Sequence, residues 1–158
     1  MTSMRTLVLG IGNTLLSDEG VGVHAIHQLQ EQYGDTPNTR FIDGGTLSFT
    51  LAAEIEEADN LIVIDATQLH DKPGTVKAFV DEEMDKFLGN GNKRSVHEVG
   101  LLDLIHISRM TGHFPKRRAL FGIQPQKLDW GENPTEPVSA AIPLICEQVM
   151  QQIRSWQS

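Results

Sequence analysis

Residues 7–22 read LVLGIGNTLLSDEGVG, and this stretch decides the fold of the chain. A short apolar run breaks at Gly10, the chain turns through Gly12, and an acid pair follows at Asp18 and Glu19. An apolar pattern with helical spacing comes next. A strand, a glycine turn and a helix that begins with acids are typical of a binding site in α/β proteins. The stretch therefore predicts that a ligand binds just beyond the first strand.

Strand and helix patterns alternate along the rest of the chain. Apolar runs predict strands at residues 7–10, 40–43, 61–64, 76–80 and 119–123, and helical spacing predicts helices at 23–34, 47–60, 95–112 and 142–156. The first three strands are joined by links long enough for helices, so they should run parallel. The link at 67–75 is too short for a helical crossover, so the fourth strand should run antiparallel. These features predict one α/β domain over residues 1–158.

Two long links and one proline carry further predictions. Residues 81–92 are polar and rich in glycine and asparagine at their end, which predicts an exposed, mobile loop. Residues 124–137 hold three prolines and Trp130, and irregular links of this length are usually functional. We expect substrate contacts around Trp130 and at 89–94. Pro143 should lie near the first turn of the last helix, where proline is tolerated.

The charge balance excludes several kinds of partner. Of the 158 residues, 13 are Lys or Arg and 21 are Asp or Glu, which gives a net charge of -8. Nucleic acids and anionic membranes bind cationic surfaces, so this excess of acids argues against both. The first residues have no apolar core of a signal peptide, and no run approaches a membrane span. We therefore expect a cytoplasmic protein.

Cysteine and most histidines add little to the predicted chemistry. The single cysteine, Cys146, excludes an internal disulfide and a cysteine-rich metal site, and its apolar helical context predicts a buried core residue. His24 and His27 lie three residues apart and can share one helix face. We expect them to be ordinary surface histidines.

Four polar residues are expected near the carboxyl ends of strands. Glu19 follows the first strand, Asp43 ends the second, Asp65 ends the third, and His97 lies in the first turn of a later helix. Open α/β sheets bind ligands at this edge. Glu19, Asp65 and His97 together would make a three-ligand metal site with open coordination positions. Such a donor set suits zinc, nickel, iron or manganese, and the residues alone leave that choice open.

Two other sites fit the residues poorly. His97 does not begin a zincin motif, because Leu101 stands where the second histidine would be. The glycine turn does not complete a dinucleotide fingerprint, because its third position is Leu15 and Glu19 would repel a pyrophosphate. The turn therefore favours a cation, and we expect its glycines to let the chain turn closely and to clear space for a bulky partner.

Five motifs together resemble those of the [NiFe]-hydrogenase maturation endopeptidases. They are GIGNTLLSDEGVG at 10–22, DGGT at 43–46, IDA at 64–66, SVHE at 95–98 and FGIQP at 121–125. Enzymes of this family remove the C-terminal extension of a hydrogenase large subunit after nickel insertion. The resemblance implies a three-layer α/β/α sandwich of the phosphorylase/hydrolase-like type. Its five-stranded mixed sheet would have the order 2-1-3-5-4, with strand four antiparallel.

The resemblance also implies roles for the four residues at the sheet edge. The metal ligands of the family correspond to Glu19, Asp65 and His97, and the acid of its DGG motif corresponds to Asp43, which we predict to be catalytic. The metal would be nickel supplied by the substrate, and zinc or cadmium could occupy the site in vitro. The expected partner is the large-subunit precursor of a [NiFe] hydrogenase, processed by a monomer. A nickel-sensing chaperone that binds this precursor without cleaving it is the alternative.

Overall fold

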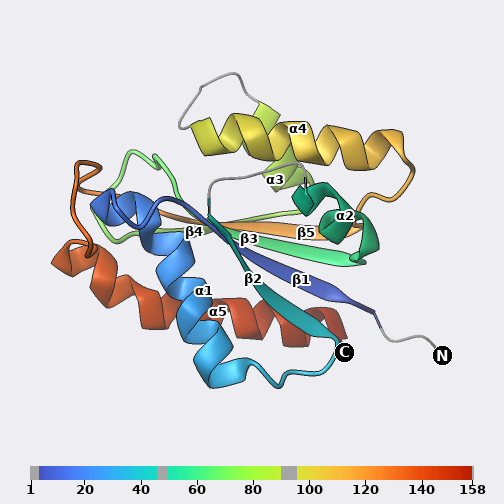
Figure 1. The fold of residues 1–158 in the computed structure, drawn as a ribbon, viewed down its shortest axis with the longest axis horizontal. Coiled ribbons are helices and arrows are strands. Elements are labelled where there is room, and N and C mark those ends of the chain that lie inside the picture. Colours follow the sequence, from blue (N-terminus) through green and yellow to red (C-terminus); the bar gives the residue numbers. More distant parts are fainter. Residues whose placement is uncertain (1–3, 46–49, 90–95, 158) are drawn as a thin grey trace.

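A five-stranded sheet forms the middle layer of the protein, whose computed structural model describes residues 4–45, 50–89 and 96–157 (Figure 1). For residues 50, 96–100 and 102 only the backbone is described. The strands are β1 (Thr6–Ile11), β2 (Thr39–Gly45), β3 (Asn60–Ala66), β4 (Val76–Val80) and β5 (Arg117–Ile123). Their order is β2-β1-β3-β5-β4, and β4 alone pairs antiparallel with its neighbour. The strand order that the resemblance implies and the predicted antiparallel direction of the fourth strand are both confirmed.

Helices cover both faces of this sheet (Figure 1). They are η1 (Ser17–Gly20), α1 (Val21–Tyr33), α2 (Thr50–Glu57), α3 (Glu82–Gly89), α4 (Val96–Met110) and α5 (Glu136–Gln157). Helices α1 and α5 pack on one face, and α2, α3 and α4 pack on the other. All seven residues of β3 are buried, as its unbroken apolar run predicts for a central parallel strand. The architecture is the predicted three-layer α/β/α sandwich.

The side chains of β1 divide between two hydrophobic cores. Val8 faces α1 and α5, whereas Leu7 and Leu9 face α2 and α4. This alternation follows from the two-residue period of a strand. The C-terminal helix α5 contributes Trp156 to the first core. No helix in the part of the chain that the structure describes is long and apolar enough to cross a membrane.

The prediction of a polar loop at 81–92 is wrong for most of that stretch. Residues 82–89 form the helix α3, and residues 90–92 lie outside the description. The first turn of α3 is acidic, which favours a helix N-terminus, and Met84 is fully buried. Phe87 and Leu88, three and four residues further on, pack on the same core. The charged residues of α3 hid this helical spacing.

The prediction for Pro143 is also wrong. Helix α5 begins at Glu136, so Pro143 lies inside the helix and not near its first turn. A proline removes one backbone hydrogen bond, here the bond to the carbonyl of Ser139. Both Pro143 and Ser139 are exposed, so water can solvate that carbonyl. The predicted N-cap of α4, Ser95, and the predicted start of α2 at Leu47 lie outside the described residues.

Candidate active site

Three parallel strands end at one edge of the sheet and bring the predicted acids together there. Gly10 of β1 is in register with Asp43 of β2 on one side and with Ile64 of β3 on the other. Asp43 and Asp65 therefore flank the end of β1. Glu19 lies in η1, which follows the same strand and contacts β3. The sheet edge thus gathers three of the four predicted site residues.

Close packing of backbone segments explains the glycines of the first motif. A Cβ atom on Gly10 would come within 2.2 Å of the carbonyl oxygen of Gly22, so α1 lies directly on β1. Gly12 has a φ of 139°, and a Cβ there would lie 2.0 Å from the carbonyl oxygen of Glu19. The expectation that these glycines let the chain turn closely is therefore confirmed, whereas the expectation that they clear space for a partner is wrong. The chain itself fills that space and fixes the position of Glu19.

The structure describes the side chains of two of the three predicted metal ligands and only the backbone of the third. Asp65 is 2% exposed at the end of β3, and Glu19 is half-buried. The backbone of His97 lies in the first turn of α4, as predicted, but its side chain is outside the description. Among the described side chains, no group of three His, Cys, Asp or Glu residues is arranged to hold a metal ion. The predicted set needs His97, so it stays a prediction.

A hollow of about 340 Å³ lies beside this edge, between the β1 turn and the end of β2. Its lining residues are Gly12, Asn13, Thr14, Val23, Asp43 and Gly45. Among these, Asp43 is the one with a carboxyl side chain. Its carboxylate accepts a hydrogen bond from the Gly45 N–H at 2.9 Å, and its other oxygen lies 3.0 Å from Nε2 of His27. Asp43 is therefore held in place at the rim of the hollow.

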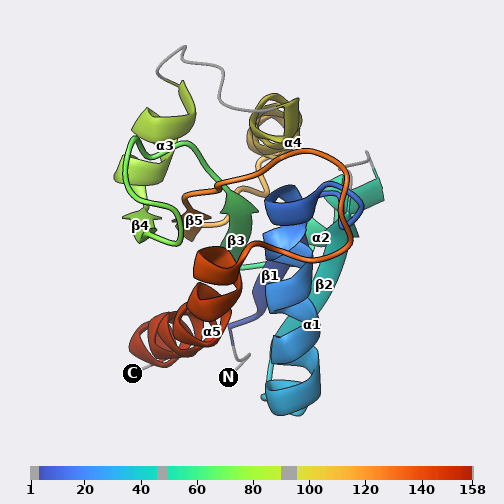
Figure 2. The same cartoon turned by 90° about the vertical axis from the view of Figure 1, so that its left-hand side faces the viewer.

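Asp18 has a structural role that the sequence did not reveal. Its carboxylate is fully buried and accepts hydrogen bonds from the backbone N–H groups of Gln126, Lys127 and Thr135. The Thr135 hydroxyl donates to it as well. Burial alone would raise the pKa of Asp18, but these hydrogen bonds outweigh it and hold the pKa below its usual value. Asp18 thus anchors residues 124–135, here called the Trp130 loop, beside the β1 turn (Figure 2).

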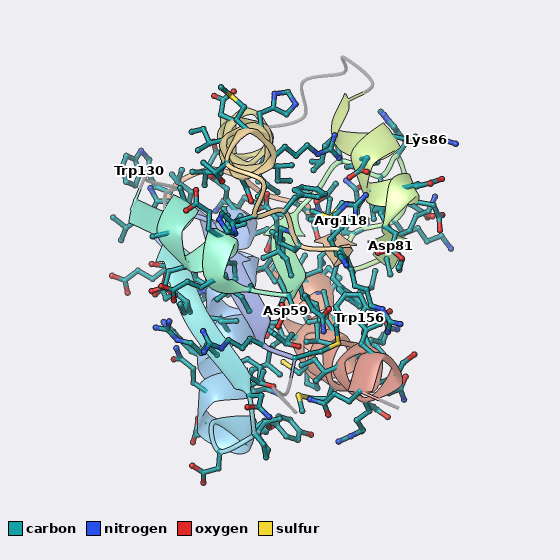
Figure 3. The ribbon with its side chains drawn as sticks, turned by 90° about the vertical axis from the view of Figure 1, so that its right-hand side faces the viewer. Asp59, Asp81, Lys86, Arg118, Trp130 and Trp156 are labelled. Carbon is teal, nitrogen blue, oxygen red and sulfur yellow. The ribbon has the colours of Figure 1, made fainter. Side chains whose placement is uncertain are left out.

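Backbone contacts complete the attachment of the Trp130 loop. The Ser17 N–H donates to the Gly131 carbonyl at 2.8 Å, and the Gly131 N–H donates to the Leu15 carbonyl at 2.9 Å. The loop nevertheless exposes its tryptophan. Trp130 is 75% exposed, whereas Trp156 is 7% exposed against the core (Figure 3). Leu15 is exposed too. The predicted substrate contacts around Trp130 stay a prediction, as do those at 89–94.

Comparison with known protein families shows which family the chain belongs to. The family model HycI, described as hydrogenase maturation protease, matches residues 23–152. The chain belongs to this family. The match covers Asp43, Asp65 and His97, while Glu19 lies just before it. The predicted family and the predicted enzyme class, a hydrolase that cleaves peptide bonds, are confirmed.

Individual relatives support the same assignment over nearly the whole chain. The hydrogenase expression/formation protein HupD of Rhizobium leguminosarum bv. viciae is 41% identical over 153 residues, which are 96% of this chain and 75% of that protein. The hydrogenase 2 maturation protease of Escherichia coli K12 is 38% identical over 152 residues, 96% of this chain and 92% of that one. Both alignments are long enough to include the edge of the sheet described above.

Solved structures share the fold of this maturation protease. The hydrogenase maturating endopeptidase HybD from E. coli superposes with a TM-score of 0.89 at 37% identity, covering 96% of this chain and 93% of that one. The [NiFe] hydrogenase maturation protease HybD from Thermococcus kodakarensis gives a TM-score of 0.77 at 28% identity, with coverages of 94% and 99%. The strand order of this protein is the order that the resemblance implies.

Proposed function

We propose that this protein removes the C-terminal extension of a [NiFe]-hydrogenase large-subunit precursor after nickel has been inserted. Membership of the hydrogenase maturation proteases supports the reaction class. The observation that carries the proposal is the convergence of Glu19, Asp43 and Asp65 at the end of β1. Action as a cytoplasmic monomer is part of the same proposal.

Glu19, Asp65 and His97 are the proposed ligands for the nickel that the precursor carries. Two carboxylates and one imidazole suit a first-row divalent metal ion and leave positions for ligands of the precursor. Because the metal arrives with the substrate, cleavage can depend on whether insertion has taken place. Nickel held between the two proteins would polarise the scissile carbonyl or its attacking water.

Asp43 is the proposed general base. Its carboxylate lies at the rim of the hollow beside the β1 turn, on the strand next to the one that leads to Glu19. A carboxylate at hydrogen-bond distance from a water molecule can accept its proton as the oxygen attacks a carbonyl carbon. The proposal therefore divides the acids between binding the metal and moving a proton.

Cleavage of nickel-loaded and nickel-free precursor distinguishes this proposal from a chaperone. The purified protein is incubated with each form, and intact mass spectrometry follows the precursor. We expect the loaded form alone to lose a C-terminal fragment. Binding of the loaded form without loss of mass would support the chaperone instead. Equal cleavage of both forms would show that the protease does not sense nickel.

A further inference from the structure

His27 contacts Asp43 from a different element and is the one described side chain hydrogen-bonded to that carboxylate. Its Nε2 atom lies 3.0 Å from Oδ2 of Asp43. The Gly45 N–H, which binds the other oxygen, comes from the same turn as Asp43 and needs no particular side chain. The contact from α1 depends on the residue type at position 27. This contact from His27 binds Oδ2, the second carboxylate oxygen of Asp43.

The chemistry of the pair makes Nε2 of His27 the donor of the hydrogen bond to Asp43. An ionised carboxylate can only accept hydrogen bonds, so Nε2 of His27 must carry the hydrogen. With one oxygen bound to the Gly45 N–H and the other to His27, Asp43 cannot rotate freely about its side-chain bonds.

Stability does not explain this contact well. The side chains of His27 and Asp43 are 54% and 40% exposed, and exposed ion pairs contribute little to folding. Helix α1 is also tied to β2 one turn later, where Nε2 of Gln30 donates to the Phe41 carbonyl at 2.8 Å. Val23, one turn before His27, packs at the same hollow. The face of α1 that meets β2 would stay in place without His27.

We propose that His27 is a positioning residue that orients the Asp43 carboxylate for proton transfer. This inference rests on the proposed function, because it assumes that Asp43 is the base. In the step it serves, the oxygen of a water molecule bonds to the scissile carbonyl carbon while Asp43 takes one proton of that water. The proton then passes to the leaving nitrogen as the carbon–nitrogen bond breaks. One water molecule is consumed, and one carboxyl group and one amine are formed.

Substitutions at position 27 separate orientation from structure. His27→Leu and His27→Ala remove the donor, whereas His27→Gln places an amide N–H at a similar reach. We expect the two donorless variants to lower kcat for precursor cleavage about tenfold or more, with KM within about twofold, because a misplaced base acts mainly on the chemical step. His27→Gln should keep most of the wild-type kcat.

His24→Leu is the matched control, since it makes the same change three residues earlier on α1. It should cleave at the wild-type rate. The variants at position 27 should melt within a few degrees of the wild type, because the side chains of His27 and Asp43 are exposed. Wild-type kcat in His27→Leu and His27→Ala would overturn the inference. An equal loss in His27→Gln would overturn it too, because the hydrogen bond would then not be what matters. A wild-type protein that cleaves no precursor would instead refute the proposed function.

Discussion

The carboxylate of Asp18 has no exposed surface, yet it belongs to an acidic motif that predicts a binding site. Its neighbour Glu19 is only half-buried and lies next to the edge where Asp43 and Asp65 meet. The two acids of one motif therefore do different work. Asp18 attaches the Trp130 loop, and Glu19 is a proposed metal ligand. Only the fold, which brings residues 126–135 back to the β1 turn, distinguishes them.

Replacing Asp18 should loosen that attachment. Asp18→Asn removes the charge that three backbone N–H groups and one hydroxyl share, and it turns an amide hydrogen towards donors. We expect the free energy of unfolding to fall by about 2–4 kcal/mol, measured by urea unfolding. Asp129→Asn, at an exposed position of the same loop, should change it by less than about 0.5 kcal/mol. Equal stability of the two variants would contradict the role of Asp18.

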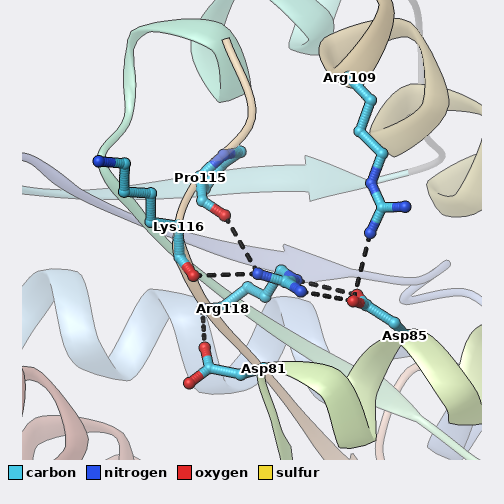
Figure 4. A network of polar contacts seen from close by, with 6 residues as sticks. All are labelled: Asp81, Asp85, Arg109, Pro115, Lys116 and Arg118. Carbon is cyan, nitrogen blue, oxygen red and sulfur yellow. Dashed lines mark hydrogen bonds and ion pairs between the residues drawn. The ribbon is translucent and has the colours of Figure 1, made fainter. Parts of the chain in front are cut away.

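At the scale of elements, α3 is joined to the sheet by a charged cluster and not only by apolar contacts. Arg118 of β5 binds the Asp85 carboxylate of α3 through two nitrogens, and Arg109 of α4 reaches the same carboxylate (Figure 4). The backbone N–H of Arg118 also donates a hydrogen bond to the carboxylate of Asp81, the residue just before α3. Hydrogen bonds from Arg118 hold the pKa of Asp85 below its usual value, although burial opposes them. The cluster links α3, α4 and β5.

The lowered pKa of Asp85 makes this link depend on pH. A carboxyl group whose pKa is lower in the folded state stabilises the fold above its unfolded pKa, near 3.9, and loses that effect as the pH falls through the folded value. We expect the free energy of unfolding to drop between about pH 5 and pH 2. Asp18 contributes in the same direction.

Asp85→Asn isolates the contribution of the cluster. The variant should lose about 1–3 kcal/mol at pH 7 and show a shallower decline in acid than the wild type, measured by urea unfolding across the pH range. Asp35→Asn, at an exposed position, should follow the wild-type curve. A variant at position 85 with the same pH dependence as the wild type would show that Asp85 does not titrate with folding.

At the scale of the whole molecule, local patterns predicted the strands and their directions, and the family resemblance supplied the strand order, but neither predicted the contacts between distant segments. The lengths of the links set parallel and antiparallel directions, and the unbroken apolar run of β3 marked the central strand. Helix α3 was missed because two charged residues, Asp85 and Lys86, separate Met84 from the adjacent Phe87 and Leu88. The contact of Asp18 with Thr135 spans 117 positions, so no local spacing could have revealed it. The pair of His27 and Asp43 joins a helix to a strand and was equally hidden.

The predicted site follows the same division. Asp43 and Asp65 could be placed at one edge because the carboxyl ends of parallel strands meet there, and the register of β1 with both neighbours confirms that placement. The proposed binding of a metal by Glu19, Asp65 and His97 depends on side-chain geometry, which a sequence pattern does not contain.

The rate at which ligand variants process nickel-loaded precursor tests whether Glu19, Asp65 and His97 bind the nickel of the precursor. Glu19→Gln, Asp65→Asn and His97→Ala are compared with the wild type by following the intact mass of the precursor over time. His106→Ala, an exposed histidine on the same helix as His97, is the control. We expect each ligand variant to slow cleavage by about a hundredfold or more, while the control cleaves at the wild-type rate. Wild-type cleavage by His97→Ala would contradict this expectation.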